Sequence, residues 1–160
     1  MAKYSIVVKN KIPELLVAIR KVEKLKLKVG VFDADRVLPE TGREVSNVML
    51  AYVHENGSAA ANLPARPFMR LGMVKVRKEL AESLVKPLRG KQRTLTNVKV
   101  QLRNAGAIAV KGMQDVISDG IALTPLKIDT VVRKASGIET PLYDTGQLFN
   151  AITFRINEHE

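Results

Sequence analysis

The residues that could carry out chemistry in this chain are few and scattered. His54 and Glu55 are adjacent, which is how the zinc-protease motif H-E-x-x-H begins. That motif needs a second histidine four residues after the first, and Ser58 stands there instead. We therefore expect His54 to lie at a helix end, satisfied by hydrogen bonds, and we predict no metal ligand here.

Other catalytic patterns are weaker still. Asp33 and Asp35 could meet a cation, but no further ligand follows them at the spacing of a calcium loop. The chain has no cysteine, which removes disulfides, thiolate catalysis and cysteine-based zinc sites. It also lacks the G-x-S-x-G, phosphate-loop and dinucleotide-binding motifs. The sequence therefore predicts a protein that is not an enzyme, with no catalytic residue, no cofactor and no metal.

The charge of the chain is concentrated in its middle third. The formal net charge is +10, from 26 basic and 16 acidic residues. Residues 66–111 hold twelve lysines and arginines against two glutamates, a balance of +10, so the rest of the chain is neutral. A basic block of this kind attracts polyanions without reading their sequence. The alternative interpretation is a solvated helical face beside an acidic partner subunit.

Within this basic block, Phe68 is the only aromatic residue, so stacking on nucleic-acid bases is not predicted. If DNA is bound, we expect contacts to phosphates alone. The candidates for facing DNA or a partner protein are Lys75, Arg77, Lys78, Lys86, Arg89, Lys91 and Arg93.

Periodic hydrophobic patterns show which elements must position these residues. Apolar residues at helical spacing predict helices at 12–22, 46–56, 67–86, 95–119 and 128–135. A short apolar stretch predicts a strand at 4–8, and alternation predicts the clearest strand at 25–31. Residues 33–44 are predicted to form a loop, either mobile or folded as a hairpin arm.

Two of the helices carry a further signal. The apolar stripe at 12–22 predicts an amphipathic helix packed on something larger. In the helix at 95–119, Ala105, Ala109 and Gly112 form a stripe of small residues that would let another helix approach closely. Gly120 is the expected end of that helix.

The fold class predicted from these elements is α+β, as a single domain over 1–160. Its sheet would be small and mostly antiparallel, with about three to four strands packed against two long helices and shorter ones. No run of about 18 apolar residues occurs, so we expect no membrane contact and a soluble protein made in the cytoplasm.

Residues 141–156, PLYDTGQLFNAITFRI, combine a turn with a strand. Asp144 and Thr145 are typical of a helix start, because their side chains accept hydrogen bonds from free backbone N–H groups. Gly146 permits a tight backbone turn. Leu148 and the apolar residues after it pass from helical spacing into alternation. We predict a single capped turn that feeds a half-buried strand.

Four segments, in this order, resemble a known family. Residues 52–57 read Y-V-H-E-N-G and residues 64–70 read P-A-R-P-F-M-R. Residues 123–130 read L-T-P-L-K-I-D-T, and residues 141–152 read P-L-Y-D-T-G-Q-L-F-N-A-I. This set is similar to the ordered motifs of tailed-phage neck and tail-completion proteins. Asn56 is a departure, because the family often has phenylalanine before that glycine.

The resemblance implies a structural virion protein that is assembled in the host cytoplasm and located at the head–tail junction. Proteins of this family form a ring, commonly a hexamer, that joins the connector to the tail tube or tail terminator while double-stranded DNA passes through. Arg66, Pro67 and Phe68 would set the start of a helix, and Asp144, Thr145 and Gly146 would fix the last strand. The alternative function is a sequence-independent DNA-binding protein that uses residues 66–111.

Overall fold

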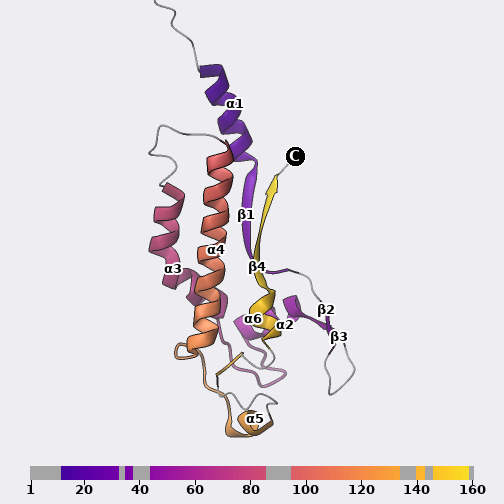
Figure 1. Ribbon diagram of the computed structural model, residues 1–160. Helices are drawn as coiled ribbons and strands as arrows, with labels where there is room; N and C mark the ends of the chain where they lie inside the picture. The colour runs from indigo at the N-terminus through magenta and orange to yellow at the C-terminus, as the bar shows by residue number, and fades with distance from the viewer. Residues whose placement is uncertain are drawn as a thin grey trace, which may run out of the picture.

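The chain is built around its longest helix, α4 (Leu95–Asp119). The computed structural model describes residues 12–32, 35–37, 44–85, 95–133, 140–142 and 146–158. α3 (Phe68–Val85) runs beside α4 on one side, and a ribbon of two strands runs beside it on another (Figure 1). The described chain is therefore mixed helix and strand, as predicted.

The ribbon joins strands from the two ends of the described chain. β1 (Leu25–Val31) and β4 (Ile152–Glu158) pair antiparallel, with Val29 opposite Phe154. The Phe154 ring lies directly on α4 at Gly106, where a Cβ atom would stand only 2.5 Å from the ring. A residue larger than glycine would push the aromatic ring away, so Gly106 sets how closely the ribbon approaches the helix.

A second pair of strands is separate from this ribbon. β2 (Asp35–Val37) and β3 (Glu44–Ser46) pair with each other, so the predicted loop at 33–44 is the arm of a hairpin in its described part. The described strands therefore form two pairs rather than one sheet of three or four strands. The strand predicted at 4–8 lies outside the described residues.

The two long helices touch backbone to backbone. A Cβ atom added to Gly72 of α3 would stand 2.5 Å from the Cα of Met113, and one added to Gly112 would stand 2.8 Å from the Gly72 carbonyl oxygen. Glycine on both helices is what permits this distance. The close approach predicted from the small-residue stripe Ala105, Ala109 and Gly112 is confirmed at Gly112, and both alanines are buried.

The hydrophobic core lies at the end of α4 where α3 begins. Phe68 and Ile117 are its largest fully buried side chains. α2 (Asn47–Asn56) and α6 (Gln147–Ala151) each add a residue to the same cluster. The buried members of this core are Ala51, Phe68, Met113, Val116, Ile117, Leu123, Leu148 and Ile152.

α1 (Ile12–Glu23) forms where the sequence predicts it, but part of its apolar stripe is uncovered. Leu16 and Ile19 are each 52% exposed, and Val17 is also exposed, while Val22 is half-buried. Figure 1 shows the reason, because α1 extends past the end of α4 and beyond the other described elements. The larger body on which this helix was expected to pack is not supplied by the described part of the chain.

The remaining helices also follow the predictions. Ser46 begins α2, and its hydroxyl accepts a hydrogen bond from the Met49 N–H at 3.1 Å. Gly120 ends α4 with φ +62°, and α5 (Ile128–Arg133) follows. None of the helices in the described ranges has the length and hydropathy that crossing a membrane requires.

Candidate functional site

The segment between α2 and α3 holds the first site predicted from the sequence. Glu55, near the end of α2, reaches the first turn of α3. Its carboxylate accepts hydrogen bonds from the backbone N–H groups of Met69 at 2.9 Å and Arg70 at 3.0 Å. The first N–H groups of a helix have no partner within the helix and lie at its positive end. The Glu55 side chain thus caps α3 from a different helix.

A tight reversal between the two helices makes this cap possible. Gly57 has φ +77°, and its N–H donates to the Val53 carbonyl at 2.7 Å. A Cβ atom at Gly57 would stand 2.8 Å from the Ala65 nitrogen, so the returning chain passes directly over this glycine. The Arg66 N–H then donates to the His54 carbonyl at 2.7 Å. These contacts explain why an acid and a glycine two residues apart precede the R-P-F segment.

Arg66 connects this reversal to the chain that follows α4. The side chain is only 5% exposed, and its Nε and Nη2 donate to the carbonyls of Thr124 at 2.8 Å and Pro125 at 3.3 Å. The Thr124 hydroxyl donates back to the Ala65 carbonyl at 3.1 Å. Burial lowers the pKa of the Arg66 guanidinium, because desolvation disfavours its charged form. The residue is therefore a structural clamp between two segments 58 positions apart.

Pro67 and Phe68 fix the start of α3 as predicted. The Pro67 carbonyl accepts a hydrogen bond from the Leu71 N–H at 3.0 Å, which is the first helical bond of α3. Phe68 is 0% exposed and anchors the helix start in the core. Leu148 of α6 belongs to the same cluster at 6% exposure. The structure therefore brings the two predicted motif regions, R-P-F and G-x-L, into one core.

Gly146 begins α6 with a left-handed backbone. Its φ is +73° and its carbonyl accepts from the Asn150 N–H at 2.9 Å. The Gln114 side chain of α4 donates to the Phe149 carbonyl at 3.1 Å, which holds α6 on the central helix. The predicted single turn feeding a strand is confirmed. Asp144 and Thr145, the predicted capping side chains, lie outside the described residues.

Replacing Glu55 with alanine is expected to lower the free energy of unfolding by about 2 kcal/mol, because two N–H groups of α3 lose a charged acceptor. Glu55→Gln keeps a neutral oxygen and is expected to cost about half as much. Urea denaturation measures both variants. Glu82→Gln on the exposed side of α3 is the control and should stay within about 0.5 kcal/mol of the parent. Equal, near-zero effects of all three substitutions would contradict the capping role.

Gly146→Val is expected to destabilise the chain by about 2 kcal/mol, because a β-branched residue is strained at this positive φ. Gly146→Ala should destabilise the chain by a smaller amount. Thermal denaturation of the two variants gives the order. Stabilisation by alanine, which is the usual result where φ is compatible, would show that the left-handed backbone is not required here.

The predicted basic surface is partly neutralised in space. The Lys75 ammonium pairs with Asp119 at 2.7 Å, and Lys111 pairs with Asp115 at 2.7 Å. A hydrogen bond from Lys111 to Asp115, together with the negative charge of that carboxylate, raises the pKa of Lys111. Both aspartates follow the 66–111 block in the sequence, so counting charges within that block missed them.

The other predicted basic residues divide into two groups. Arg77 and Lys78 are exposed on α3. The remaining candidates lie outside the described residues, and these are Lys86, Arg89, Lys91 and Arg93.

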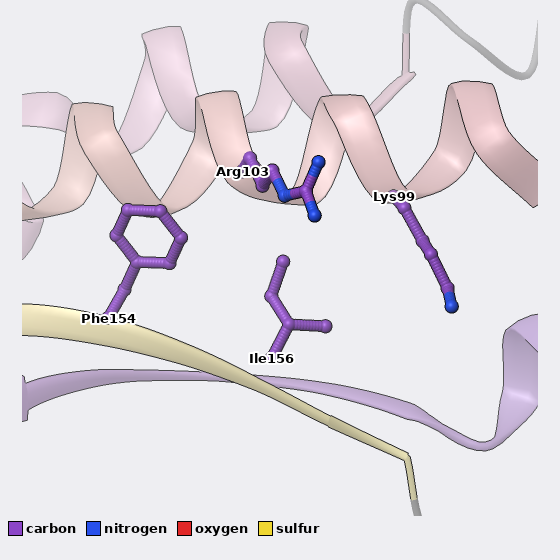
Figure 2. A pocket seen from close by; sticks show the side chains of 4 residues that line it. All are labelled: Lys99, Arg103, Phe154 and Ile156. Atoms are coloured by element: carbon purple, nitrogen blue, oxygen red, sulfur yellow. The ribbon is translucent and has the colours of Figure 1, made fainter.

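A hollow of about 280 Å³ opens between α4 and β4. Lys99 and Arg103 of α4 line it together with Phe154 and Ile156 of β4, and Figure 2 shows the Arg103 side chain above the two apolar ones. Two cations over an apolar floor could meet a carboxylate or a phosphate, but the lining holds no hydroxyl, thiol or carboxyl group. Lys99 already has an interaction within the chain. No local pattern in the sequence indicates this hollow, because its lining residues come from segments about 50 residues apart.

His54 lies half-buried near the end of α2, where it was predicted. Across the described ranges, no three histidine, cysteine, aspartate or glutamate side chains come together in a way that could hold a metal ion.

Neither the known family models, nor curated proteins, nor solved structures show a match to this chain. The site is therefore interpreted from its own geometry: a capped helix start, a buried arginine clamp and a left-handed turn that share one core. Such an arrangement holds α3, α6 and the segment after α4 in fixed positions relative to one another.

Proposed function

We propose that the chain is a structural virion protein of a tailed phage. In this role it forms a homo-oligomeric ring, a hexamer, at the head–tail junction. The ring joins the tail tube or tail terminator to the connector and lets genomic DNA pass. The role needs no catalytic centre and no cofactor.

The observation that carries the proposal is the convergence of the motifs on which the resemblance rests. Glu55 of the first segment caps the helix that the second segment begins. Arg66 of the second segment binds the carbonyls of Thr124 and Pro125 in the third. Leu148 of the fourth packs in the core with Phe68. Motifs that hold one another in place are expected of a family defined by a common shape.

Uncovered apolar residues at opposite ends of the molecule support assembly. Leu16, Val17 and Ile19 of α1 are exposed at one end, and Ile128 and Val132 of α5 are 81% and 78% exposed at the other (Figure 1). Exposed apolar side chains gathered on one element often mark contacts between proteins. Two different surfaces at opposite ends suit a head-to-tail contact, which produces a ring when the rotation closes. The larger predicted sheet would follow if residues 4–8 paired with an edge of the β1–β4 ribbon.

Mass spectrometry of purified tailed particles, made by the genome that encodes this chain, tests the virion role. The chain should be present at more than one copy per particle. Its absence from complete particles would overturn the proposal. Light scattering after size exclusion tests the ring separately, since such subunits can stay monomeric until they dock.

A substitution in α1 tests the contact surface. Leu16→Glu combined with Ile19→Glu should remove the chain from particles, because charges replace the apolar surface. Arg20→Glu, an exposed position on the same helix, is the control and should leave incorporation intact. Normal incorporation of the double variant would exclude α1 as a contact surface.

The second candidate function is sequence-independent DNA binding through residues 66–111. The exposure of Arg77 and Lys78 on α3 favours it. Loss of duplex binding on replacing those two residues with glutamine would support this candidate.

A further inference from the structure

The outer face of the β1–β4 ribbon carries a row of cations that the basic middle block does not include. Strand residues point alternately to the two faces, and Lys26 and Lys28 of β1 are exposed, as is Arg155 of β4. The register places Lys28 directly opposite Arg155 and Lys26 opposite Asn157. Thr153 and Asn157, the other exposed residues of β4 on this face, are neutral.

Among the described residues, none of these three cations forms an ion pair with an acid. The ion pairs of Lys75 with Asp119 and of Lys111 with Asp115 lie on α3 and α4 and do not reach the ribbon. Like charges directly opposite each other weaken a strand pair. The side chains of Lys28 and Arg155 therefore repel each other across the ribbon unless an anion lies over them.

Arg155 is also held in place. Its guanidinium carbon lies 4.6 Å from the centre of the Phe32 ring. Stacking of this kind orients the planar guanidinium and leaves its N–H groups on the edge free to donate. Such a group can bind two phosphate oxygens at once, whereas a lysine meets a phosphate as a point charge.

The spacing of the row suits a repeating polyanion. Lys26 and Lys28 are two residues apart on one strand, about 6.8 Å, and the neighbouring strand lies about 4.8 Å away. Duplex DNA carries one phosphate per strand for about every 3.4 Å of its helix axis, so cations held about 5–7 Å apart on the ribbon can each contact a different phosphate.

We propose that the outer face of the β1–β4 ribbon, defined by Lys26, Lys28 and Arg155, binds the phosphate backbone of duplex DNA without reading its sequence. Charge complementarity selects the occupant. A protein partner is disfavoured because the buried centre of a protein interface is poor in charged residues, and the exposed strand residues on this face are all charged or short and polar. An anionic membrane is disfavoured because none of the exposed strand residues on this face is apolar or aromatic, and the Phe32 ring beside them is half-buried and stacked against Arg155. The inference holds for the isolated chain and needs no ring.

Two triple variants of the full chain test this surface. Lys26→Gln, Lys28→Gln and Arg155→Gln remove three cations from the ribbon. Arg70→Gln, Arg77→Gln and Lys78→Gln remove three exposed cations from α3 and form the matched control, because the net charge changes equally. Circular dichroism and the thermal midpoint establish that each variant is folded.

Fluorescence anisotropy with a duplex of random sequence, titrated at salt concentrations from about 50 to 200 mM, gives the result. The slope of log K against log salt should be smaller in the ribbon variant by about 0.9 for each phosphate that is no longer neutralised, or up to about 2.7. We expect its affinity at the lowest salt to be at least tenfold weaker, and the α3 variant to bind like the parent.

Three outcomes would overturn the inference. The parent chain could fail to bind duplex DNA, or the α3 variant alone could lose binding, which would assign the contact to the middle block. The third is a ribbon variant that binds DNA normally but no longer binds polyglutamate or vesicles containing phosphatidylserine, which would assign the face to an acidic protein or a membrane. None of these outcomes depends on the presence of the chain in particles, so the virion role is tested independently.

Discussion

Gly72→Val is expected to prevent the chain from reaching its native fold. A Cβ atom at Gly72 would stand 2.5 Å from the Cα of Met113, 2.6 Å from its nitrogen and 2.9 Å from the Gly112 carbonyl carbon. All three neighbours are backbone atoms, so no side-chain rotation relieves the contact and α3 must move away from α4. Inserting carbons into a packed core costs roughly 1–3 kcal/mol where side chains can adjust, and more where they cannot. A total stability of about 5–15 kcal/mol leaves little margin.

Gly72→Ala separates two opposing effects. In an exposed helix the change would stabilise by about 1 kcal/mol, because alanine is the better helix former. Here the clash outweighs that gain, and we expect a net loss of about 3 kcal/mol in urea denaturation. Ala81→Val, which adds carbons at an exposed position of the same helix, should change stability by less than about 1 kcal/mol. A stabilised Gly72→Ala would show that the two helices are not in backbone contact.

The sequence predicted the local elements well, because their signals are local. The bounds of α4, Leu95–Asp119, were predicted from a long periodic pattern and from Gly120 after it. β1 followed from the alternation of leucine and valine with lysine. The small-residue stripe correctly indicated a close helix contact, but the glycine on the other helix, Gly72, carried no recognisable signal. Two helices can approach closely only where both carry small residues at the contact. The spacing of residues along one helix does not show which residue of another helix it will meet.

The spacing of apolar residues was a poorer guide to which faces of α1 and α2 are buried. In α2, Val48, Met49 and Tyr52 have helical spacing, yet all three are exposed, whereas Asn47 and Ala51 are buried. The stripe on α1 was expected to be covered, yet Leu16 and Ile19 are exposed. A stripe shows that a helix face seeks apolar surroundings, but it does not say whether the same chain supplies them. Both faces are available for contacts with other subunits in the proposed ring.

The contacts that make the site could not be read from the sequence. The cap of α3 by Glu55 spans 14 and 15 residues, and the Arg66 clamp spans 58 and 59. The sequence drew attention to Glu55 as a neighbour of His54 and as part of the Y-V-H-E-N-G segment, but not as a helix cap. Standard capping patterns place the acid within the first residues of the helix, so an acid on the preceding helix gives no local signal. Glu55 and Arg66 both lie in the segments on which the resemblance rests, but the resemblance does not explain what joins them.

Arg66→Met is expected to destabilise the chain by about 3 kcal/mol. Two competing effects decide whether the free energy of unfolding falls or rises. Replacing a buried charge by an apolar side chain of similar length relieves a desolvation cost, and such replacements have stabilised other proteins. The buried guanidinium also makes two charge-assisted hydrogen bonds, to the carbonyls of Thr124 and Pro125, each worth about 1.5–3 kcal/mol. We expect the second effect to prevail, because methionine leaves both carbonyls without a donor.

Loss of the clamp should also change hydrogen exchange locally, in the segment after α4, whereas a general loss of packing would affect the whole core. Removing Arg66 frees the chain after α4, so amide exchange is expected to speed up near Leu123, whose N–H donates to the Gly120 carbonyl at 3.1 Å. Arg66→Lys keeps the charge but can satisfy only one carbonyl well, so its cost should fall between those of the parent and Arg66→Met. Thr124→Val removes only the return bond to Ala65 and should cost about 1 kcal/mol. If the clamp closes as one unit, the Arg66→Met, Thr124→Val double variant should lose less stability than the sum of the two single losses. A double variant whose loss equals that sum would show that the two sets of hydrogen bonds act separately.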